Sequence, residues 1–377
     1  THRKLRQDVL QSAQLVTIAR LGPKGFQTPM WDFNVALLTL THGKAAKGHA
    51  FVGLDAANEK TPDEKASTLR TGDTALVGQE AQLENPDERI LIEQSLSTNT
   101  LSNYAISQQG ITTGDLKRFG VFFWETTVLA IWKFWQSTTE YSVPYAGREK
   151  ILRWQEENFS LEEVPGATLR GSNSWGRKGI LVSLMGDLPV TLSSGEISDD
   201  NTSRIIPNVE DHYLAIWTFC SSLEYSSLIR KIDQAIKVMP NTLLKVPFDL
   251  AHWQQVAAEK YPNGLPNPHS DDPTQWLFNG HPQGAEQPLQ IAVARLLGYQ
   301  WPRQTGSSFP DCPALGPDGL EAFADADGIV PLTSLRDEDP AAERLRRLLA
   351  AALGQSWKAG TELELIRETG SKAATLE

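Results

Sequence analysis

The first sixty residues carry one helical pattern followed by two short apolar runs. Apolar positions at roughly helical spacing predict a helix over residues 2–20, namely Val9, Leu10, Ala13, Val16 and Ala19. Residues 31–41 and 50–54 are strand candidates, separated by a turn that begins at His42, and together they predict a hairpin. Residues 35–40 are almost continuously apolar, which is typical of a strand covered on both faces. Because a lone hairpin is only marginally stable, we expect a larger α/β domain upstream of this chain.

The middle of the chain has the pattern of a β-rich module. Residues 59–80 are polar and predict a loop, and residues 85–97 predict a helix. Residues 119–135 are so rich in aromatic side chains that helix and strand stay equally open. Short apolar pieces then alternate with Gly, Pro, Asn and Ser, and residues 180–185 and 203–206 predict strands between long loops.

The last third of the chain is mainly helical. Residues 211–237 predict two helices, or one helix that breaks near Ser221. A short strand is expected at residues 242–246, and Pro- and Gly-rich loops are expected at residues 262–282 and 301–326. Further helices are predicted at residues 250–261, 289–298 and 340–353, the last ending at Gly354.

Composition narrows the class of protein. A chain of 377 residues suggests two or three modules, and 40% hydrophobic residues are enough for a substantial core. A net charge of −11 argues against a generic nucleic-acid coat, but a specific reader needs only a basic contact face. Cys220 and Cys312 are far apart and have no partners at zinc spacing, so we expect a reducing, cytoplasmic location and no metal. No long uncharged apolar run predicts a membrane span.

Sequence motifs of several catalytic and cofactor-binding sites are incomplete or absent in this chain. The nearest glycine turn for a nucleotide or methyl donor is Val52–Asp55, and no glycine-patterned helix follows it. Asp325–Gly328 resembles the start of a calcium loop but lacks the later acidic ligands. A phosphate-binding Gly-Lys-Ser/Thr signature and a Gly-x-Ser-x-Gly nucleophile elbow are both absent from the sequence.

The stretch from Gly110 to Lys178 combines basic, aromatic and small polar residues on predicted loops. Arg and Lys neutralise phosphates, Arg forks onto guanine edges, and aromatic rings stack on extruded bases. The candidate DNA-binding residues are Arg118, Arg148, Lys150, Arg153, Trp154, Arg170, Ser172, Ser174, Trp175, Arg177 and Lys178. The alternative is that Trp154 and Trp175 belong to a core and the charges form a solvated face.

We expect different roles for different groups of these residues. We expect Arg170, Arg177 and Lys178 to contact phosphates or base edges. The residues expected to line the groove are Arg148, Lys150 and Arg153, and those expected in the core are Trp124, Trp132 and Trp217.

Ordered motifs across most of the chain carry a family resemblance. They are Ala19–Gly22 with Phe26, Met30–Asn34, Gly110–Asp115 with Arg118-Phe119, Phe123–Glu125, Tyr145, Arg153-Trp154, Leu244–Asp249, Asp272–Trp276 and Gly280–Pro282. In this order they resemble the C-terminal, target-recognition part of large DNA adenine-N6 methyltransferases. These enzymes belong to type IIG-like restriction–modification systems and to phage-defence systems of the PglX and DISARM kind.

The resemblance implies an α+β organisation in four parts. Residues 1–57 would be the terminal strand hairpin of a class I methyltransferase sheet, 58–109 a connecting segment, 110–210 a β-rich target-recognition module, and 211–377 a mainly helical supporting region. The family's Asn-Pro-Pro-Tyr and Gly-rich S-adenosylmethionine motifs are absent from this sequence. We therefore carry over no catalytic residue and expect the catalytic and cofactor motifs upstream.

The implied function is recognition of double-stranded DNA for an adenine-N6 methyltransferase. Its partners would be DNA, the upstream methyltransferase domain with its S-adenosylmethionine, and other subunits of a defence system. The alternative is a protein–protein interaction module of a phage-defence complex that uses the aromatic middle of the chain to bind a partner. A nuclease role is weaker, because no convincing metal-binding arrangement of acidic residues is present.

Overall fold

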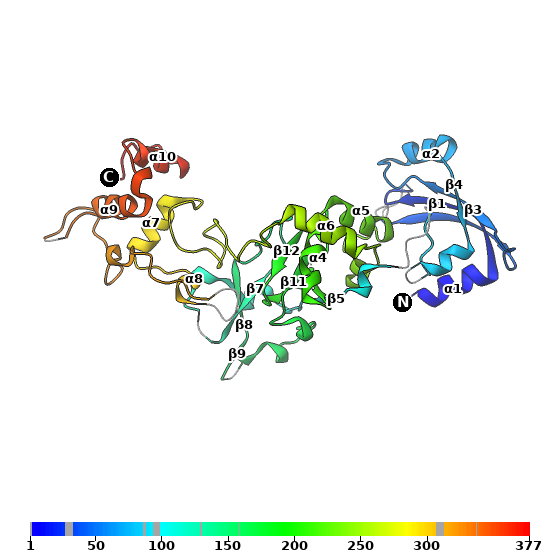
Figure 1. Cartoon of the computed structure of the whole chain (residues 1–377), viewed down its shortest axis with the longest axis horizontal. Helices are drawn as coiled ribbons and strands as arrows, with labels where there is room; N and C mark the ends of the chain where they lie inside the picture. Colours follow the sequence, from blue (N-terminus) through cyan, green and yellow to red (C-terminus); the bar gives the residue numbers. More distant parts are fainter. Residues whose placement is uncertain are drawn as a thin grey trace. The chain divides into compact units, whose positions relative to one another are not determined.

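The computed structural model describes residues 2–26, 33–85, 88–92, 99–128, 130–157, 159–306, 313–336 and 338–377. The chain forms two compact units. Unit 1 comprises Thr1–Ser107, Leu184–Leu188 and Pro207–Pro262, and unit 2 comprises Gln108–Ser183, Pro189–Ile206 and Asn263–Glu377. Several small sheets and a largely helical C-terminal region confirm the predicted α+β class (Figure 1). The division into four segments stays a prediction.

Unit 1 begins with a four-stranded sheet that differs from the predicted hairpin. Its elements are α1 (Arg3–Ser12), β1 (Ala13–Gly22), β2 (Val35–His42), β3 (Ala50–Asp55) and β4 (Ala75–Gly78). The strand order is β2-β1-β3-β4, with β1 antiparallel to β2 and parallel to β3. The hairpin prediction is therefore wrong, because β1 lies between the two strands expected to pair. Since these strands belong to a four-stranded sheet, a lone hairpin is no longer a reason to expect a larger domain upstream. Figure 1 shows α2 (Pro62–Thr71) and α1 on opposite sides of these strands.

The predicted helix over residues 2–20 ends at Ser12. The run Val16-Thr17-Ile18 is β-branched, and such residues favour a strand over a helix. Gln79 stabilises the junction by donating from Nε2 to the carbonyls of Leu10 and Ala13, both at 2.8 Å. The strands β1 and β4, together with α2, lie in segments that were predicted as helix or loop.

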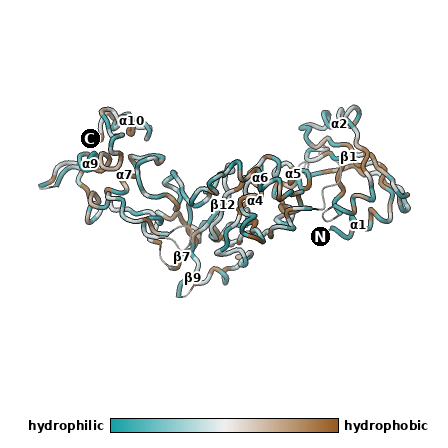
Figure 2. The backbone as a smooth tube through the Cα atoms, viewed as in Figure 1, coloured by the Kyte–Doolittle hydropathy of each residue, from teal (hydrophilic) through white to brown (hydrophobic). Residues whose placement is uncertain are grey.

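The edge strand β2 is less covered than its sequence predicts. Leu37, Leu38 and Leu40 are 45, 50 and 44% exposed, although a continuous apolar run was expected to be covered on both faces. The core of the sheet lies instead around Leu15, Phe51 and Val77. Figure 2 shows hydrophobic colouring along β1 and mainly hydrophilic colouring on α2. Residues 31 and 32 of the predicted strand, and with them part of the Met30–Asn34 motif, lie outside the described residues.

The helical part of unit 1 agrees with the prediction in most respects. It contains α4 (Tyr213–Cys220), α5 (Leu223–Ile232) and α6 (Leu250–Lys260). The break near Ser221 is confirmed, and the Ser222 hydroxyl caps α5 by accepting from Tyr225 N at 3.3 Å. Residues 242–246 form no strand, because the 3₁₀ turn η8 (Pro240–Leu244) covers most of them. The described residues of the predicted helix 85–97, namely 85 and 88–92, include no α-helix.

Unit 2 holds the β-rich region. One sheet has the order β12-β11-β14-β5, and its strands are β5 (Ala105–Gln109), β11 (Gly179–Ser183), β12 (Val190–Ser193) and β14 (Thr202–Pro207). Of these residues, Ala105–Ser107 and Pro207 are assigned to unit 1. The other has the order β13-β7-β8-β6, with β6 (Gly120–Phe122), β7 (Trp132–Gln136), β8 (Lys150–Arg153) and β13 (Ile197–Ser198). A small pair joins β9 (Gln155–Glu156) and β10 (Phe159–Ser160). The predicted strands at 180–185 and 203–206 are confirmed as β11 and β14.

Short helical turns connect these strands, and longer helices follow them. Residues 119–135, which left helix and strand open, contain the end of α3 (Leu116–Phe119), then β6, η4 (Phe123–Glu125) and β7. The later helices are α7 (Pro288–Leu296), α8 (Pro302–Thr305), α9 (Ala341–Leu353) and α10 (Thr361–Glu368), and Figure 1 shows α7, α9 and α10 together near the C-terminus. Here α7 and α9 were predicted, whereas α10 was not. Further 3₁₀ turns among the described residues are η1 (Glu80–Glu84), η3 (Leu101–Asn103), η5 (Leu161–Glu163), η6 (Ser172–Ser174), η7 (Glu210–His212), η9 (Glu321–Phe323) and η10 (Gly354–Ser356).

A partly buried ion pair attaches α7 to the loop before η9. Arg295, 3% exposed, donates to both carboxylate oxygens of Asp318 at 2.6 and 2.9 Å and to the Gly280 carbonyl at 3.0 Å. Burial raises the pKa of Asp318, but hydrogen bonds from Arg295 and from Leu320 N outweigh it and lower the pKa from 3.8 to about 2.

We expect this pair to make unit 2 sensitive to acid. Because the pKa of Asp318 is lower in the folded state, its stabilising contribution is complete above about pH 4 and is lost as the pH falls towards 2. The Asp318→Asn variant should lose stability at pH 7 but show a shallower decline between about pH 4 and 2. Urea unfolding of both proteins across this range measures the difference, and parallel curves would contradict the assignment.

Among the described residues, no helix is long and apolar enough to cross a membrane.

Candidate nucleic-acid interface

The loop from Arg170 to Lys178 is built by two close backbone approaches. Gly171 has a φ of +69°, and a Cβ there would lie 2.5 Å from the Gln109 carbonyl, so the chain turns here only with glycine. The Gly171 carbonyl then accepts from the backbone N of Ser174 at 2.8 Å and from its hydroxyl at 2.6 Å. Further along, Gly176 donates to the Gly195 carbonyl at 2.9 Å. The first part of the loop is therefore folded by its own hydrogen bonds, and its later part is attached to the backbone at Gly195.

A buried acidic side chain organises the segment opposite this loop. The Glu196 carboxylate is fully buried and accepts from Arg148 Nε at 2.8 Å. Its other oxygen accepts from the Ser193 hydroxyl and Ser194 N, both at 2.8 Å, and from Gly195 N at 3.0 Å. One carboxylate thus fixes the turn that receives Gly176.

Arg204 connects the same network to the loop. Its side chain lies fully buried on β14 and donates to the Ser174 carbonyl at 2.6 Å and to the Glu196 carbonyl. Arg148 donates in addition to the Leu192 carbonyl at 2.7 Å. We call Arg148, Glu196 and Arg204 the buried triad. It connects the segment before β8, the end of β12 and β14 to the base of the loop.

The electrostatic balance of the buried triad favours an ionised Glu196. Burial raises the pKa of Glu196, but the positive charges of Arg148 and Arg204 outweigh burial and place the pKa below its usual value. A charged carboxylate between two guanidinium groups is stable in this position only while all three groups are present.

The structure separates the predicted residues by exposure. Those that are exposed are Arg118, Arg170, Ser172, Arg177 and Lys178; those that are half-buried are Lys150, Arg153, Trp154 and Trp175; and those that are buried are Arg148 and Ser174. Asn173 is also exposed, between Ser172 and Ser174. The exposed members gather on the 170–178 loop, apart from Arg118 at the end of α3.

Two of the predicted contacts are corrected. Arg148 was expected to line a DNA groove, but its side chain is fully buried against Glu196 and lies 5.6 Å from the Trp276 ring. Ser174 is 3% exposed and is bound to Gly171 and Arg204. Both residues shape the loop from inside and present no surface to a ligand.

The half-buried candidates have intramolecular contacts of their own. Trp154 and Trp175 meet edge to face with ring centres 5.2 Å apart, and both pack against the core around Trp135 and Leu152. Arg153 pairs with Glu156. These contacts agree with the core alternative for the two tryptophans, and base stacking by them stays a prediction. Of the three expected core tryptophans, Trp217 is buried, Trp132 is half-buried, and Trp124 is 42% exposed, so the prediction for Trp124 is wrong.

Glu196 and Arg204 were not among the residues predicted from the sequence. Arg204 stands between Ser203 and the apolar pair Ile205-Ile206 in a predicted strand, where a buried charge needs a counter-charge. Glu196 follows Ser193-Ser194-Gly195, which has the composition of a tight turn. Neither of these two sequence contexts shows that Arg204 and Glu196 are partners of each other.

The segment Val52–Asp55, considered above as a glycine turn for a cofactor, lies within β3. A Cβ at Gly53 would be 2.8 Å from the Ile92 side chain. The glycine therefore serves close packing. Among the described residues, no three His, Cys, Asp or Glu side chains are placed to hold a metal ion.

No protein-family model matches this chain, and no curated protein matches it. Two solved structures that are similar are restriction–modification enzymes in complex with DNA. One is the Type IIL enzyme MmeI in complex with DNA, at 11% identity and a TM-score of 0.34, with 97% of this chain and 49% of that chain covered. The other is a nuclease-deletion mutant of the Type ISP enzyme LlaGI in complex with a DNA substrate mimic, at 13% identity and a TM-score of 0.39, with 97% and 37% covered.

This chain thus spans less than half the length of either similar chain. TM-scores below 0.5 do not establish a common fold.

Proposed function

We propose that this chain recognises double-stranded DNA through the 170–178 loop, as the specificity-conferring part of an adenine-N6 DNA methyltransferase of a restriction–modification or phage-defence system. The observation that carries the proposal is a loop of exposed basic and small polar side chains held by a buried ionic network. The family resemblance of the ordered sequence motifs adds the methyltransferase context.

The chemistry of the loop suits a duplex. Arg170, Arg177 and Lys178 are exposed cations within nine residues, and cations of this kind neutralise backbone phosphates. Ser172 and Asn173 are exposed between them and can donate to phosphates or accept from base edges. Because the buried triad fixes the loop beforehand, less conformational entropy is lost on binding.

Catalysis belongs to another part of the proposed enzyme. An upstream methyltransferase domain would bind S-adenosylmethionine and transfer the methyl group to an extruded adenine, while this chain holds the duplex. The exposed apolar side chains of β2 support a protein partner at the first sheet, since an apolar edge strand is a common place for another chain to join.

Removing two loop cations should change the salt dependence of DNA binding. For Arg177→Ala combined with Lys178→Ala, we expect weaker binding and a slope of log affinity against log salt that is shallower by about 2, since each phosphate contact contributes about 0.9. Fluorescence anisotropy with a labelled duplex at about 50 and 200 mM salt measures both quantities.

The matched control removes the same charge elsewhere in unit 2. Lys358 and Lys372 are exposed near the C-terminus, and their double alanine variant should leave the slope close to that of the wild type. If both double variants shift the slope equally, the effect is one of net charge and the loop is not the interface. If the wild type does not bind DNA at the lower salt, while a protein partner binds with little salt dependence, the interaction-module alternative replaces the proposal.

A further inference from the structure

A preformed pocket opens in unit 2 between η4 and α7. Its volume is about 380 Å³, which is within the range of small-molecule sites. None of the residues of the 170–178 loop or of the buried triad lines it. The pocket is therefore a second feature of this unit, and the DNA contacts proposed above do not account for it.

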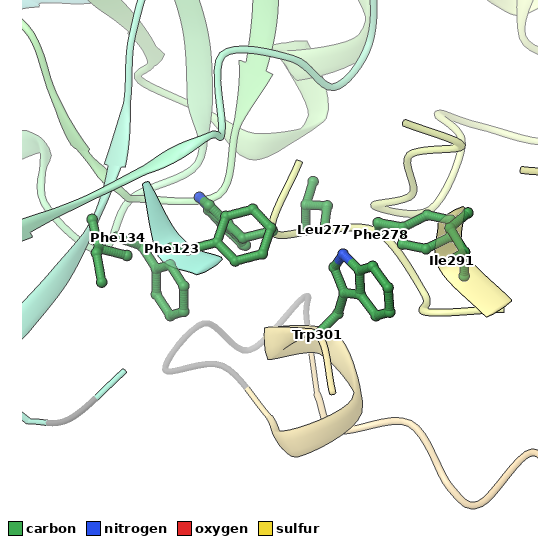
Figure 3. Packing of buried hydrophobic residues seen from close by; sticks show 8 residues of the cluster. Phe123, Phe134, Leu277, Phe278, Ile291 and Trp301 are labelled. Atoms are coloured by element: carbon green, nitrogen blue, oxygen red, sulfur yellow. The ribbon is translucent and has the colours of Figure 1, made fainter. Parts of the chain in front are cut away.

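Three buried apolar side chains form the inner part of the pocket. Phe123, Ile291 and Trp301 are at most 5% exposed and belong to one aromatic-rich core cluster. Figure 3 shows their side chains within this cluster, although the residues come from distant parts of the sequence. Trp301 Nε1 donates to the Pro273 carbonyl at 2.8 Å, which fixes the indole ring. This hydrogen bond and the packing of the cluster define the shape of the inner wall.

Two further aromatic side chains line the pocket closer to solvent. Trp124 remains 42% exposed, although it stacks on Phe122 with ring centres 4.6 Å apart and meets Phe123 edge to face at 4.9 Å. Tyr299 is half-buried and meets Trp301 edge to face at 4.9 Å. A large, exposed indole held in place at an apolar pocket provides a flat surface on which another ring can stack.

The polar side chains that line the pocket are the amides of Gln287 and Gln290 and the hydroxyls of Thr274 and Tyr299. Gln287 and Gln290 are exposed at the start of α7, and Gln287 has the uncommon positive φ of +56° for a non-glycine residue. A carboxamide presents a donor and an acceptor side by side, which matches the edge of a heteroaromatic base. Of the described residues that line the pocket, none is charged. This composition disfavours phosphates and ionised ligands.

We propose that this pocket binds a planar, uncharged heteroaromatic ring of the nucleobase class. The ring would stack against Trp124 and place its polar edge towards Gln287 and Gln290. An aliphatic side chain would use the apolar wall but leave the amides without a function. The ring can belong to a free nucleoside or to an unstacked base of a DNA strand, and the chemistry of recognition is the same for both.

Titration of the full chain with the four nucleosides, followed by saturation-transfer NMR, tests the proposal. We expect at least one nucleoside to bind and Trp124→Ala to weaken it about 5- to 150-fold, the range for loss of one aromatic stacking partner. Gln290→Leu should change the preference among the bases while retaining stacking. Tyr141→Ala is the matched control, because Tyr141 is an exposed aromatic residue outside the pocket, and binding should be unchanged.

Several results would overturn the inference. One is that no nucleoside binds the wild type at millimolar concentration. Another is that leucine amide binds as well as any nucleoside, which identifies a pocket for a peptide side chain. A third is that Trp124→Ala and Gln290→Leu, both shown to be folded by circular dichroism, bind nucleosides like the wild type.

A second experiment determines whether the bound ring belongs to a DNA strand or to a free nucleoside. A short single strand and an abasic strand of equal length carry the same phosphates but differ in their bases. If Trp124→Ala weakens binding of the nucleosides and of the base-containing strand but not of the abasic strand, the ring comes from DNA. If it weakens binding of the nucleosides but of neither strand, the ligand is a free small molecule. Both results support the proposed chemistry. The variant that lacks Arg177 and Lys178 should still bind nucleosides, which separates this pocket from the DNA-binding loop.

Discussion

Replacing Glu196 by glutamine should destabilise unit 2 by about 3–5 kcal/mol, the usual cost of breaking a buried ion pair. The carboxylate interacts with Arg148 and, through its charge, with Arg204, and its side chain is fully buried. Glutamine retains the shape and part of the hydrogen bonding, but the two buried guanidinium groups then lose the negative charge that Glu196 supplies. Urea unfolding followed by tryptophan fluorescence measures the loss.

A matched control uses an ion pair of the same types at the surface. Arg153 and Glu156 pair with both side chains at least 40% exposed, so Glu156→Gln should change stability little. Hydrogen exchange should also rise in peptides that cover residues 170–178 and 190–206 of the Glu196→Gln protein. A stable variant with unchanged exchange in these peptides would show that the buried triad does not hold the loop.

The same variant connects stability with the proposed function. If a rigid loop contributes to DNA affinity, Glu196→Gln should bind the duplex more weakly under conditions in which the protein is still folded. Its salt slope should stay close to that of the wild type, because the loop cations are still present. This outcome differs from the shallower slope expected when Arg177 and Lys178 are removed.

Truncation of Trp276 to alanine is the second change with a large expected effect, again about 3–5 kcal/mol. Trp276 is fully buried, its ring centre lies 4.4 Å from that of Phe134, and the Arg148 guanidinium is 5.6 Å from it. The large cavity left behind would lie between β7 and the loop before α7 that carries Trp276. The surrounding side chains can fill it only partly. Urea unfolding and near-ultraviolet circular dichroism measure the loss of stability and packing.

Trp124→Ala is the control for this prediction. It removes the same side chain from a position that is 42% exposed, so less apolar area is lost from the interior and the destabilisation should be clearly smaller. Equal losses for the two variants would mean that Trp276 contributes no more packing energy than a surface residue.

The parts of the fold that were predicted correctly depend on local sequence. The interruption between α4 and α5 coincides with the Ser221-Ser222 pair, and α9 begins after Pro340 and ends at Gly354. Capping residues, proline and glycine act within one helical turn, and a single sequence therefore carries these signals. The strands β11 and β14 were similarly visible as apolar runs between turn residues.

The predictions that were wrong concern elements whose structure depends on contacts with residues far away in the sequence. The helical spacing of apolar residues runs from Val9 to Ala19, but the helix ends at Ser12. Residues 13–22 form a strand because β1 pairs with both β2 and β3. A strand in this position is stabilised by hydrogen bonds to segments 13–35 residues away, and local periodicity contains no information about them.

For the candidate interface, the sequence alone determined which segment carries cations, aromatic rings and small polar side chains between Gly110 and Lys178. Tertiary structure decided which of them reach the surface: Arg177 is exposed, whereas Arg148 is buried. An arginine has the same local pattern in either setting, and only the position of a carboxylate 48 residues away, on Glu196, makes burial of its charge favourable.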